Sequence, residues 1–312
     1  MSLREAKSYP KRFRYATVQG FFLQDEPDTD PLSFDYTRAE FGLIDRKYDT
    51  DIEFDPDRQK TQWQRFEHHL FYLNKNSEPD IHYKLLFLGR HGEGVHNVAE
   101  NLYGTAAWNS HYSKLPGSPD GSKIWLDAPL TEKGVLQALT AHEFWSHMLT
   151  AGHIPPPKTY YTSPLTRCLT TASLTFSSLP LPPSCPFRPI VKELLRETNG
   201  VHTCDKRSSR TYILDNFPSF GIEPGFSEED ELWDPEIRES DSKTDERMRR
   251  FMDDVFENGG KGEEVVSFTS HSGAVASLLR VVGHREFRLA TGSCMPVLVR
   301  GERIGGKAAD DI

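Results

Sequence analysis

The chain has 312 residues, 37% of them hydrophobic and 27% charged, and a formal net charge of −9 at neutral pH. This is the composition of a folded protein with either one large core or two domains. The acidic balance argues against a nucleic-acid partner, because duplex binding depends on neutralising phosphates, and no apolar run approaches the roughly 18 residues of a membrane span.

Residues 1–80 are acidic and rich in aromatic side chains, and we expect them to form an extension packed on the main body. Within them, residues 61–76 predict an amphipathic helix. Its apolar face is predicted to carry Trp63, Phe66, Leu70 and Phe71.

The first residues contain no apolar stretch of the kind found in secretory signals. The cysteines have neither paired nor zinc-like spacing, which indicates reduced thiols. They are Cys168, Cys185, Cys204 and Cys294. Together these observations predict a cytoplasmic protein without a resident metal.

Strands and helices alternate from residue 81 to 312, the predicted catalytic domain, which carries insertions near 102–127 and 198–243. Strands are expected at 84–89, in 159–165 with a break at Pro164, and at 190–195, 263–271 and 294–300. Helices are expected at 130–149, 165–176, 244–258 and 272–282. Thr131 and Thr244 are the expected caps of the first and third of these helices. The side chains of the first helix expected to face inward are Leu136, Leu139, Phe144 and Met148. Such alternation predicts an α/β fold, with a parallel sheet between two layers of helices.

Polar side chains follow four of the predicted strands, where ligands of such sheets bind. Arg90 and His91 follow the first strand, Arg167 lies just beyond the second, Glu197 follows the third, and His271 follows the fourth. The sequence therefore predicts one site at this edge of the sheet.

These residue types suit phosphoryl transfer. Guanidinium groups match phosphate oxygens, and a neutral imidazole can attack phosphorus to form a phospho-histidine. Nearby guanidinium charges keep an imidazole neutral, while a second histidine can stabilise the transferring group and a carboxylic acid can protonate the leaving oxygen. Gly92 and Gly94 would let the backbone approach the anion closely. This chemistry requires no metal or other cofactor.

Four segments carry a family resemblance: "GRHGEGVHN", "SPLTRCLTTA", "LLRETNG" and "TSHSGA". In order and spacing they resemble the motifs of the histidine phosphatase (phosphoglycerate mutase-like) superfamily, over about residues 82–300. "GVHTCDKR" is similar to a segment of the fungal phosphoglycerate mutase-like phosphatases. Ser272 follows His271 where the phytase branch has Asp, which favours branch 1. The resemblance implies a three-layer α/β/α fold with a mostly parallel central sheet.

The resemblance also implies roles. His91 would be the phosphorylated nucleophile, and Glu197 would act as proton donor and then as base. The phosphate pocket would be formed by Arg90, Asn97, Arg167 and His271. The implied activity is metal-independent hydrolysis of small phosphorylated metabolites through a phospho-histidine intermediate.

The chain departs from the family at two points. Gly94 stands where many members have Thr, and the segment after Glu197 lacks the R-H-Y-G of phosphoglycerate mutases. A phosphomutase is therefore the alternative function. A catalytically idle phospho-ligand binder is disfavoured, because the nucleophile, both arginines, the acid and the second histidine are all present.

Several assignments stay open from sequence. Glu193 and Asp205 are alternatives to Glu197 as the acid, and Gly94 and His202 are possible substrate contacts. Three cations of the 198–243 insertion either bind a second anionic group of the substrate or face solvent; they are Lys206, Arg207 and Arg210. The tryptophans at 108, 125 and 145 are interpreted as core or lid residues.

Overall fold

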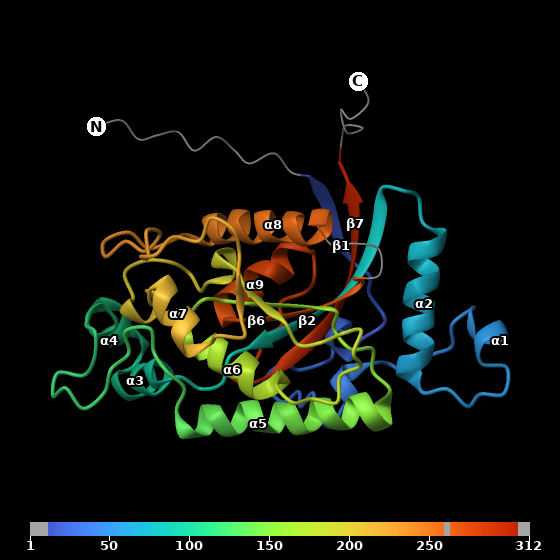
Figure 1. The fold of residues 1–312 in the computed structure, drawn as a ribbon, viewed down its shortest axis with the longest axis horizontal. Helices are drawn as coiled ribbons and strands as arrows, with labels where there is room; N and C mark the ends of the chain where they lie inside the picture. Colours follow the sequence, from blue (N-terminus) through green and yellow to red (C-terminus); the bar gives the residue numbers. More distant parts are fainter. Residues whose placement is uncertain (1–11, 259–262, 305–312) are drawn as a thin grey trace.

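Seven strands form one central sheet in the order β1-β7-β2-β6-β3-β4-β5 (Figure 1). The structure, a computed structural model, describes residues 12–258 and 263–304; residues 1–11 of the predicted extension and 305–312 of the predicted catalytic domain lie outside it. The strands are β1 (Phe13–Thr17), β2 (Ile81–Arg90), β3 (Thr159–Thr162), β4 (Pro189–Val191), β5 (Gly221–Ile222), β6 (Val265–Ser270) and β7 (Cys294–Arg303).

Six of these seven strands run in the same direction, and β7, the second strand from one edge, runs opposite to them. β2 pairs with β6, β6 with β3, β3 with β4 and β4 with β5, all in parallel. β7 runs antiparallel to both β2 and β1. The predicted mostly parallel sheet is therefore confirmed. The sequence did not predict β1, which alternates buried Phe13 and Tyr15 with exposed Arg14 and Ala16.

Helices cover both faces of the sheet (Figure 1). They are α1 (Asp51–Phe54), α2 (Gln62–Asn76), α3 (Val95–Tyr103), α4 (Thr105–Ser110), α5 (Glu132–His147), α6 (Thr166–Phe176), α7 (Arg210–Asn216), α8 (Asp241–Asn258) and α9 (Ser272–Val281). β2 separates two cores: Leu86 and Leu88 pack with α8 and α9, whereas Leu85 and Phe87 pack with α2, α5 and α6. A strand buried on both faces is continuously apolar, and the architecture is three-layer α/β/α.

The helix predicted at 61–76 is α2, and Thr61 caps it by accepting a hydrogen bond from Gln64 N. Trp63, Phe66 and Leu70 are buried in the same core as β2, so residues 12–80 contribute to the main core. The prediction for Phe71 is wrong, because this side chain is 58% exposed. The boundary at residue 80 stays a prediction.

Helix α5 shows a second difference from the prediction. Thr131 caps it as expected, and Met148 is buried, but Leu136 and Leu139 are exposed. The buried face instead carries Gly134, Ala138, Ala141 and Trp145. Thr175 Oγ1 of α6 donates to the Ala138 carbonyl of α5 at 3.4 Å, so the two helices lie close together on the face with small side chains, and the leucines are left on the solvent side.

Other predicted boundaries also shift. The strand predicted at 190–195 stops at Val191 and continues as a 3₁₀ turn, and α8 begins at Asp241, ahead of the predicted cap Thr244. The insertion near 102–127 contains α4 and buries Trp108 and Trp125, as expected for core residues.

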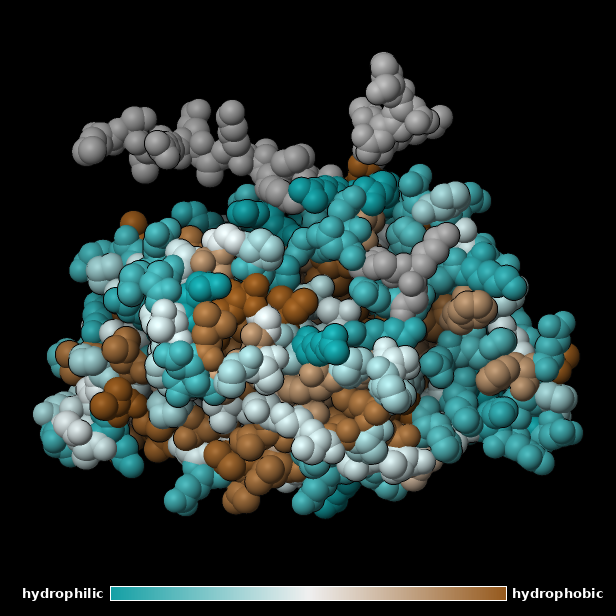
Figure 2. Space-filling model, in the orientation of Figure 1, coloured by the Kyte–Doolittle hydropathy of each residue, from teal (hydrophilic) through white to brown (hydrophobic). Residues whose placement is uncertain are grey.

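Figure 2 shows a largely hydrophilic or neutral face interrupted by apolar patches. In the part of the chain that the structure describes, no helix is long and apolar enough to cross a membrane. All four cysteines are buried and unpaired.

Candidate active site

The ends of β2 and β6 bring the two motif histidines together. Arg90 lies opposite Ser270 in the parallel register, and the next residue, His91, donates its backbone N–H to the Ser270 carbonyl at 3.0 Å. The rings of His91 and His271 have centroids 5.1 Å apart. Two segments 180 residues apart in the chain therefore meet because their strands are neighbours.

His91 is held in one tautomer. Its Nδ1 lies 2.6 Å from the Gly92 carbonyl oxygen, which can only accept, so Nδ1 carries the proton. Nε2 keeps its lone pair and accepts a hydrogen bond from Arg167 Nε at 3.3 Å. Burial, reinforced by the charges of Arg167 and Arg90, holds the pKa of His91 well below its usual range. A neutral imidazole with an unprotonated Nε2 is a nucleophile.

Arg167 lies in the first turn of α6, and both of its Nη atoms donate to the loop after Glu197. Nη1 donates to the Cys204 carbonyl at 2.6 Å, and Nη2 donates to Asp205 Oδ1 at 2.9 Å. Arg238 binds the other oxygen of Asp205 at 2.8 Å. Burial alone would raise the pKa of Asp205, but Arg238 and Arg167 hold it below the usual value. Asp205 therefore stays ionised and is unsuited to donate a proton.

His271 is fully buried behind His91. Its Nε2 lies 2.7 Å from Ser163 Oγ and 3.4 Å from Cys168 Sγ. Burial, followed by the charge of Arg167, lowers the pKa of His271 well below its usual range. The second motif histidine is thus neutral and fixed in orientation by the residues that follow β3.

Glu197 lies against the N-terminus of α9. Its Oε2 accepts from Gly273 N at 3.1 Å, and its Oε1 accepts from Thr198 N at 2.9 Å. A Cβ atom at position 273 would lie 2.2 Å from Glu197 Oε1, so a side chain there would displace this carboxylate. Glu193, the third candidate acid, instead pairs with Arg196 and Arg207. Glu197 and Asp205 line the pocket, and Glu193 does not. Of these two acids, only Asp205 forms salt bridges to described residues, so Glu197 is the better candidate for the proton donor.

These groups surround a pocket of about 330 Å³. Its lining includes Arg90, His91, His96, Asn97, Glu100, Trp108, Asn109, Arg167, Glu197, Thr198, His202, Cys204, Asp205, Arg238, Ser272, Gly273 and Arg288. A volume of this size suits a small metabolite. Arg90, His91, Asn97, Arg167, Glu197 and His202 are therefore brought together, and His271 supports them from behind.

The backbone amides of Gly92 and Gly94 do not bind the anion as the sequence predicted. The Gly92 N–H is used by Thr171 Oγ1 at 3.0 Å, and the Gly94 N–H by Asn97 Oδ1 at 2.9 Å. A Cβ atom on Gly92 would lie 2.3 Å from the Gly134 carbonyl oxygen. Gly92 is thus required for packing against α5, and neither amide N–H is free to bind an anion.

The three cations considered in the sequence for a second anionic group of the substrate do not line the pocket. Arg207 is buried against Glu193 and Phe226, and neither Lys206 nor Arg210 lines the pocket. Arg238 and Arg288 do line it. Both lie in irregular segments without a motif, so nothing in the sequence singled them out.

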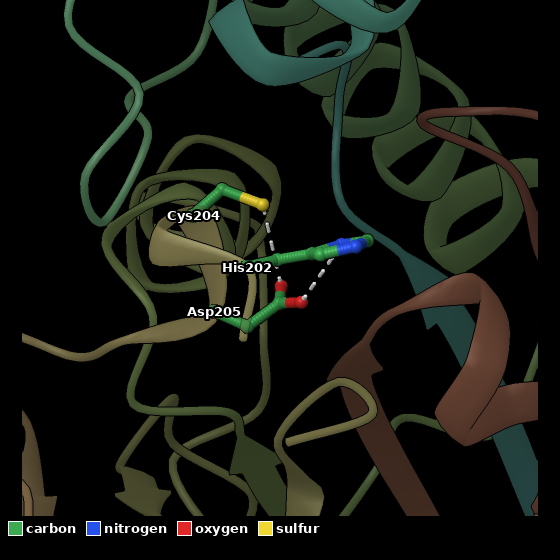
Figure 3. A group of neighbouring side chains, drawn as sticks. All are labelled: His202, Cys204 and Asp205. Carbon is green, nitrogen blue, oxygen red and sulfur yellow. Dashed lines mark hydrogen bonds and ion pairs between the residues drawn. The ribbon is translucent and has the colours of Figure 1, made fainter. Parts of the chain in front are cut away.

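Three pocket residues could be considered for a metal ion. Ligand atoms of His202, Cys204 and Asp205 all lie within 4.8 Å of one another, and Figure 3 shows Cys204 and His202 both directed toward Asp205. However, both Asp205 oxygens are bound by arginines, and burial raises the pKa of the Cys204 thiol well above its usual value. A protonated thiol beside two guanidinium groups fits a cation poorly.

Comparisons with known proteins identify the family and the relatives of this chain. The sequence family described as the histidine phosphatase superfamily (branch 1) matches residues 120–291, more than half of the chain. The chain belongs to this superfamily. The matched part of this histidine phosphatase sequence includes Arg167, Glu197 and His271, and Arg90 and His91 lie ahead of it.

Relatives in fungi extend the similarity. The "Probable phosphoglycerate mutase" of Arthroderma benhamiae is 54% identical over 288 residues, which cover 92% of this chain and 84% of that protein. "Phosphomutase-like protein 3" of Candida albicans is 40% identical over 69% of this chain and 65% of its own length. "Probable phosphoglycerate mutase PMU1" of Saccharomyces cerevisiae is 32% identical over 74% and 83%, respectively.

Proposed function

We propose that this protein is a metal-independent phosphatase that hydrolyses small phosphorylated metabolites through a phospho-histidine on His91. The observation that carries the proposal is the unprotonated Nε2 of a neutral, buried His91, which accepts a hydrogen bond from Arg167 Nε at 3.3 Å at the wall of the pocket. An anion bound there would have its oxygens at guanidinium groups and its phosphorus in front of a nucleophile.

The reaction runs in two steps. His91 Nε2 attacks phosphorus, the bond to the ester oxygen breaks, and Glu197 transfers a proton to that leaving oxygen. Glu197, now a carboxylate, takes a proton from a water molecule as that water attacks the phospho-histidine, which releases phosphate and restores His91. Arg90 and Arg167 stabilise the charge on the phosphoryl oxygens, Asn97 completes the pocket lining, and His271 supports His91 from outside that lining.

A phosphomutase is the second candidate, because the relatives in Arthroderma benhamiae and Saccharomyces cerevisiae carry the name of probable phosphoglycerate mutase. A mutase returns the phosphoryl group to its substrate and must keep water away. The pocket here extends to the exposed residues Asn109 and Arg288, so water can enter it. The same opening would admit the substrate of a mutase, so it does not separate the two activities; the absence of the R-H-Y-G segment after Glu197 favours hydrolysis.

An assay of p-nitrophenyl phosphate hydrolysis with EDTA present tests the proposal. We expect turnover in the wild type and a loss of at least roughly 10⁴-fold in His91→Ala, by analogy with nucleophile deletions in other enzymes. Undiminished turnover in that variant would overturn the assignment. Conversion of 3-phosphoglycerate to 2-phosphoglycerate without release of phosphate would favour the mutase.

The unpaired cysteines further support a reducing, cytoplasmic environment.

A further inference from the structure

Arg288 lines the pocket but has no role in the proposed mechanism. Its neighbours Phe287 and Leu289 are buried in the core, so the backbone on either side of it is anchored, while the Arg288 side chain is exposed and lines the pocket. Within residues 12–258 and 263–304 it forms no hydrogen bond or salt bridge. Its guanidinium donors are therefore available to a ligand.

The loop that carries Arg288 is fixed to the candidate nucleophile. Arg90 Nη1 donates to the Leu289 carbonyl at 2.8 Å, and Gly292 N donates to the His91 carbonyl at 2.9 Å. These bonds hold Arg288 beside Arg90, close enough for their charges to repel. Two like charges held next to each other at a pocket wall are a favourable place for an anion.

The pocket has more arginines than one phosphate engages, alongside the carboxylates of Glu100, Glu197 and Asp205. Four arginines line it, and a phosphate on His91 engages Arg90 and Arg167. Arg238 is compensated by its salt bridge to Asp205. Arg288 alone is left with neither a protein carboxylate nor a part in phosphate binding.

We propose that Arg288 binds a second anionic group of the substrate, so that the preferred substrates are phosphomonoesters that also carry a carboxylate or a second phosphate. This inference rests on the proposed function and adds the substrate class to it. A charge-assisted hydrogen bond from a guanidinium suits either oxyanion.

Matched substrates test this. 3-Phosphoglycerate has a carboxylate where glycerol 3-phosphate has a hydroxymethyl group, and fructose 1,6-bisphosphate and fructose 6-phosphate form the pair for a second phosphate. In Arg288→Ala we expect kcat/KM to fall about 10- to 100-fold on the substrate with the second anion and less than about 3-fold on its partner. Arg288→Lys should retain part of the preference. The control is Arg188→Ala, an exposed arginine outside the pocket lining.

The two substrate pairs identify the anionic group that Arg288 binds. A selective loss with 3-phosphoglycerate alone indicates a carboxylate, and a selective loss with fructose 1,6-bisphosphate alone indicates a second phosphate. Equal losses on both members of each pair would show general attraction of anions and would overturn the inference, as would no loss on any. If p-nitrophenyl phosphate is still hydrolysed, either of these two outcomes overturns the inference about Arg288 but leaves the proposed phosphatase function intact. Absence of phosphate release from every substrate, p-nitrophenyl phosphate included, would overturn the proposed function and this inference with it.

Discussion

Arg167 Nη2 and Asp205 Oδ1 lie 2.9 Å apart, and both side chains are buried. Asp205 belongs to the loop that follows Glu197, so the segment that supplies the candidate acid also fixes the arginine that contacts His91. A carboxylate that was one of three candidate acids in the sequence thus has a positioning role in the structure.

We predict that Asp205→Asn lowers the free energy of unfolding by about 3 kcal/mol, because Arg167 and Arg238 would lose their shared counter-charge in a buried site. Urea denaturation measures this. The matched control is Asp45→Asn, since Asp45 pairs with Arg65 at 3.3 Å but is 95% exposed, and should change stability by less than about 1 kcal/mol. Equal effects of the two substitutions would contradict the buried ion-pair interpretation.

Glu197→Gln separates the acid from the nucleophile. Loss of the proton donor should reduce turnover far more on alkyl phosphates, whose leaving oxygen needs a proton, than on p-nitrophenyl phosphate. Steady-state kinetics with both substrates measures the difference. Equal losses on the two would indicate another donor. The hydrogen bond from Gly273 N to the side chain at position 197 can persist with an amide oxygen, so the fold should be retained.

The buried histidines predict how stability depends on pH. Burial first, and then neighbouring charges, lowers the pKa of His91, His96 and His271 well below the usual range. The unfolded chain takes up protons below about pH 6.5 that the folded protein does not, so stability is full above that pH and falls as the pH decreases.

His96→Asn should therefore reduce the slope of unfolding free energy against pH by about 1 kcal/mol per pH unit between about pH 6 and about pH 5. Urea titrations at a series of pH values measure this slope. His147→Asn, which changes an exposed histidine at the end of α5, should leave it as in the wild type. An unchanged slope in the His96 variant would show that this imidazole is protonated in the folded state.

Two aromatic residues of α2 test whether the N-terminal part belongs to the main core. Trp63 is 1% exposed and packs with β2, whereas Phe71 is 58% exposed. Trp63→Ala should cost about 3–5 kcal/mol of stability, the range for a large buried aromatic residue, and Phe71→Ala less than about 1 kcal/mol. A small effect of Trp63→Ala on unfolding would mean that the segment folds apart from the rest.

The sequence was most informative where one physical rule links chain position to space. Arg90, His91 and His271 could be placed together because parallel strands in one sheet end at the same edge. The sequence could not predict which arginines bind Asp205, or that Arg238 and Arg288 line the pocket. These contacts depend on how irregular loops fold over that edge. Leu136 was misplaced for a related reason: helical periodicity indicates an apolar face, but the close approach of α5 to α6 selects its small residues instead.

The central claim is that His91 carries the phosphoryl group. The most direct measurement is rapid acid-free quenching of the Glu197→Gln variant during turnover, followed by peptide mass spectrometry under alkaline conditions, where phospho-histidine survives. We predict one phosphoryl group on the peptide that contains His91, at that residue, and its absence in His91→Ala. A phosphoryl group on any other residue, or turnover by His91→Ala at the wild-type rate, would contradict the account.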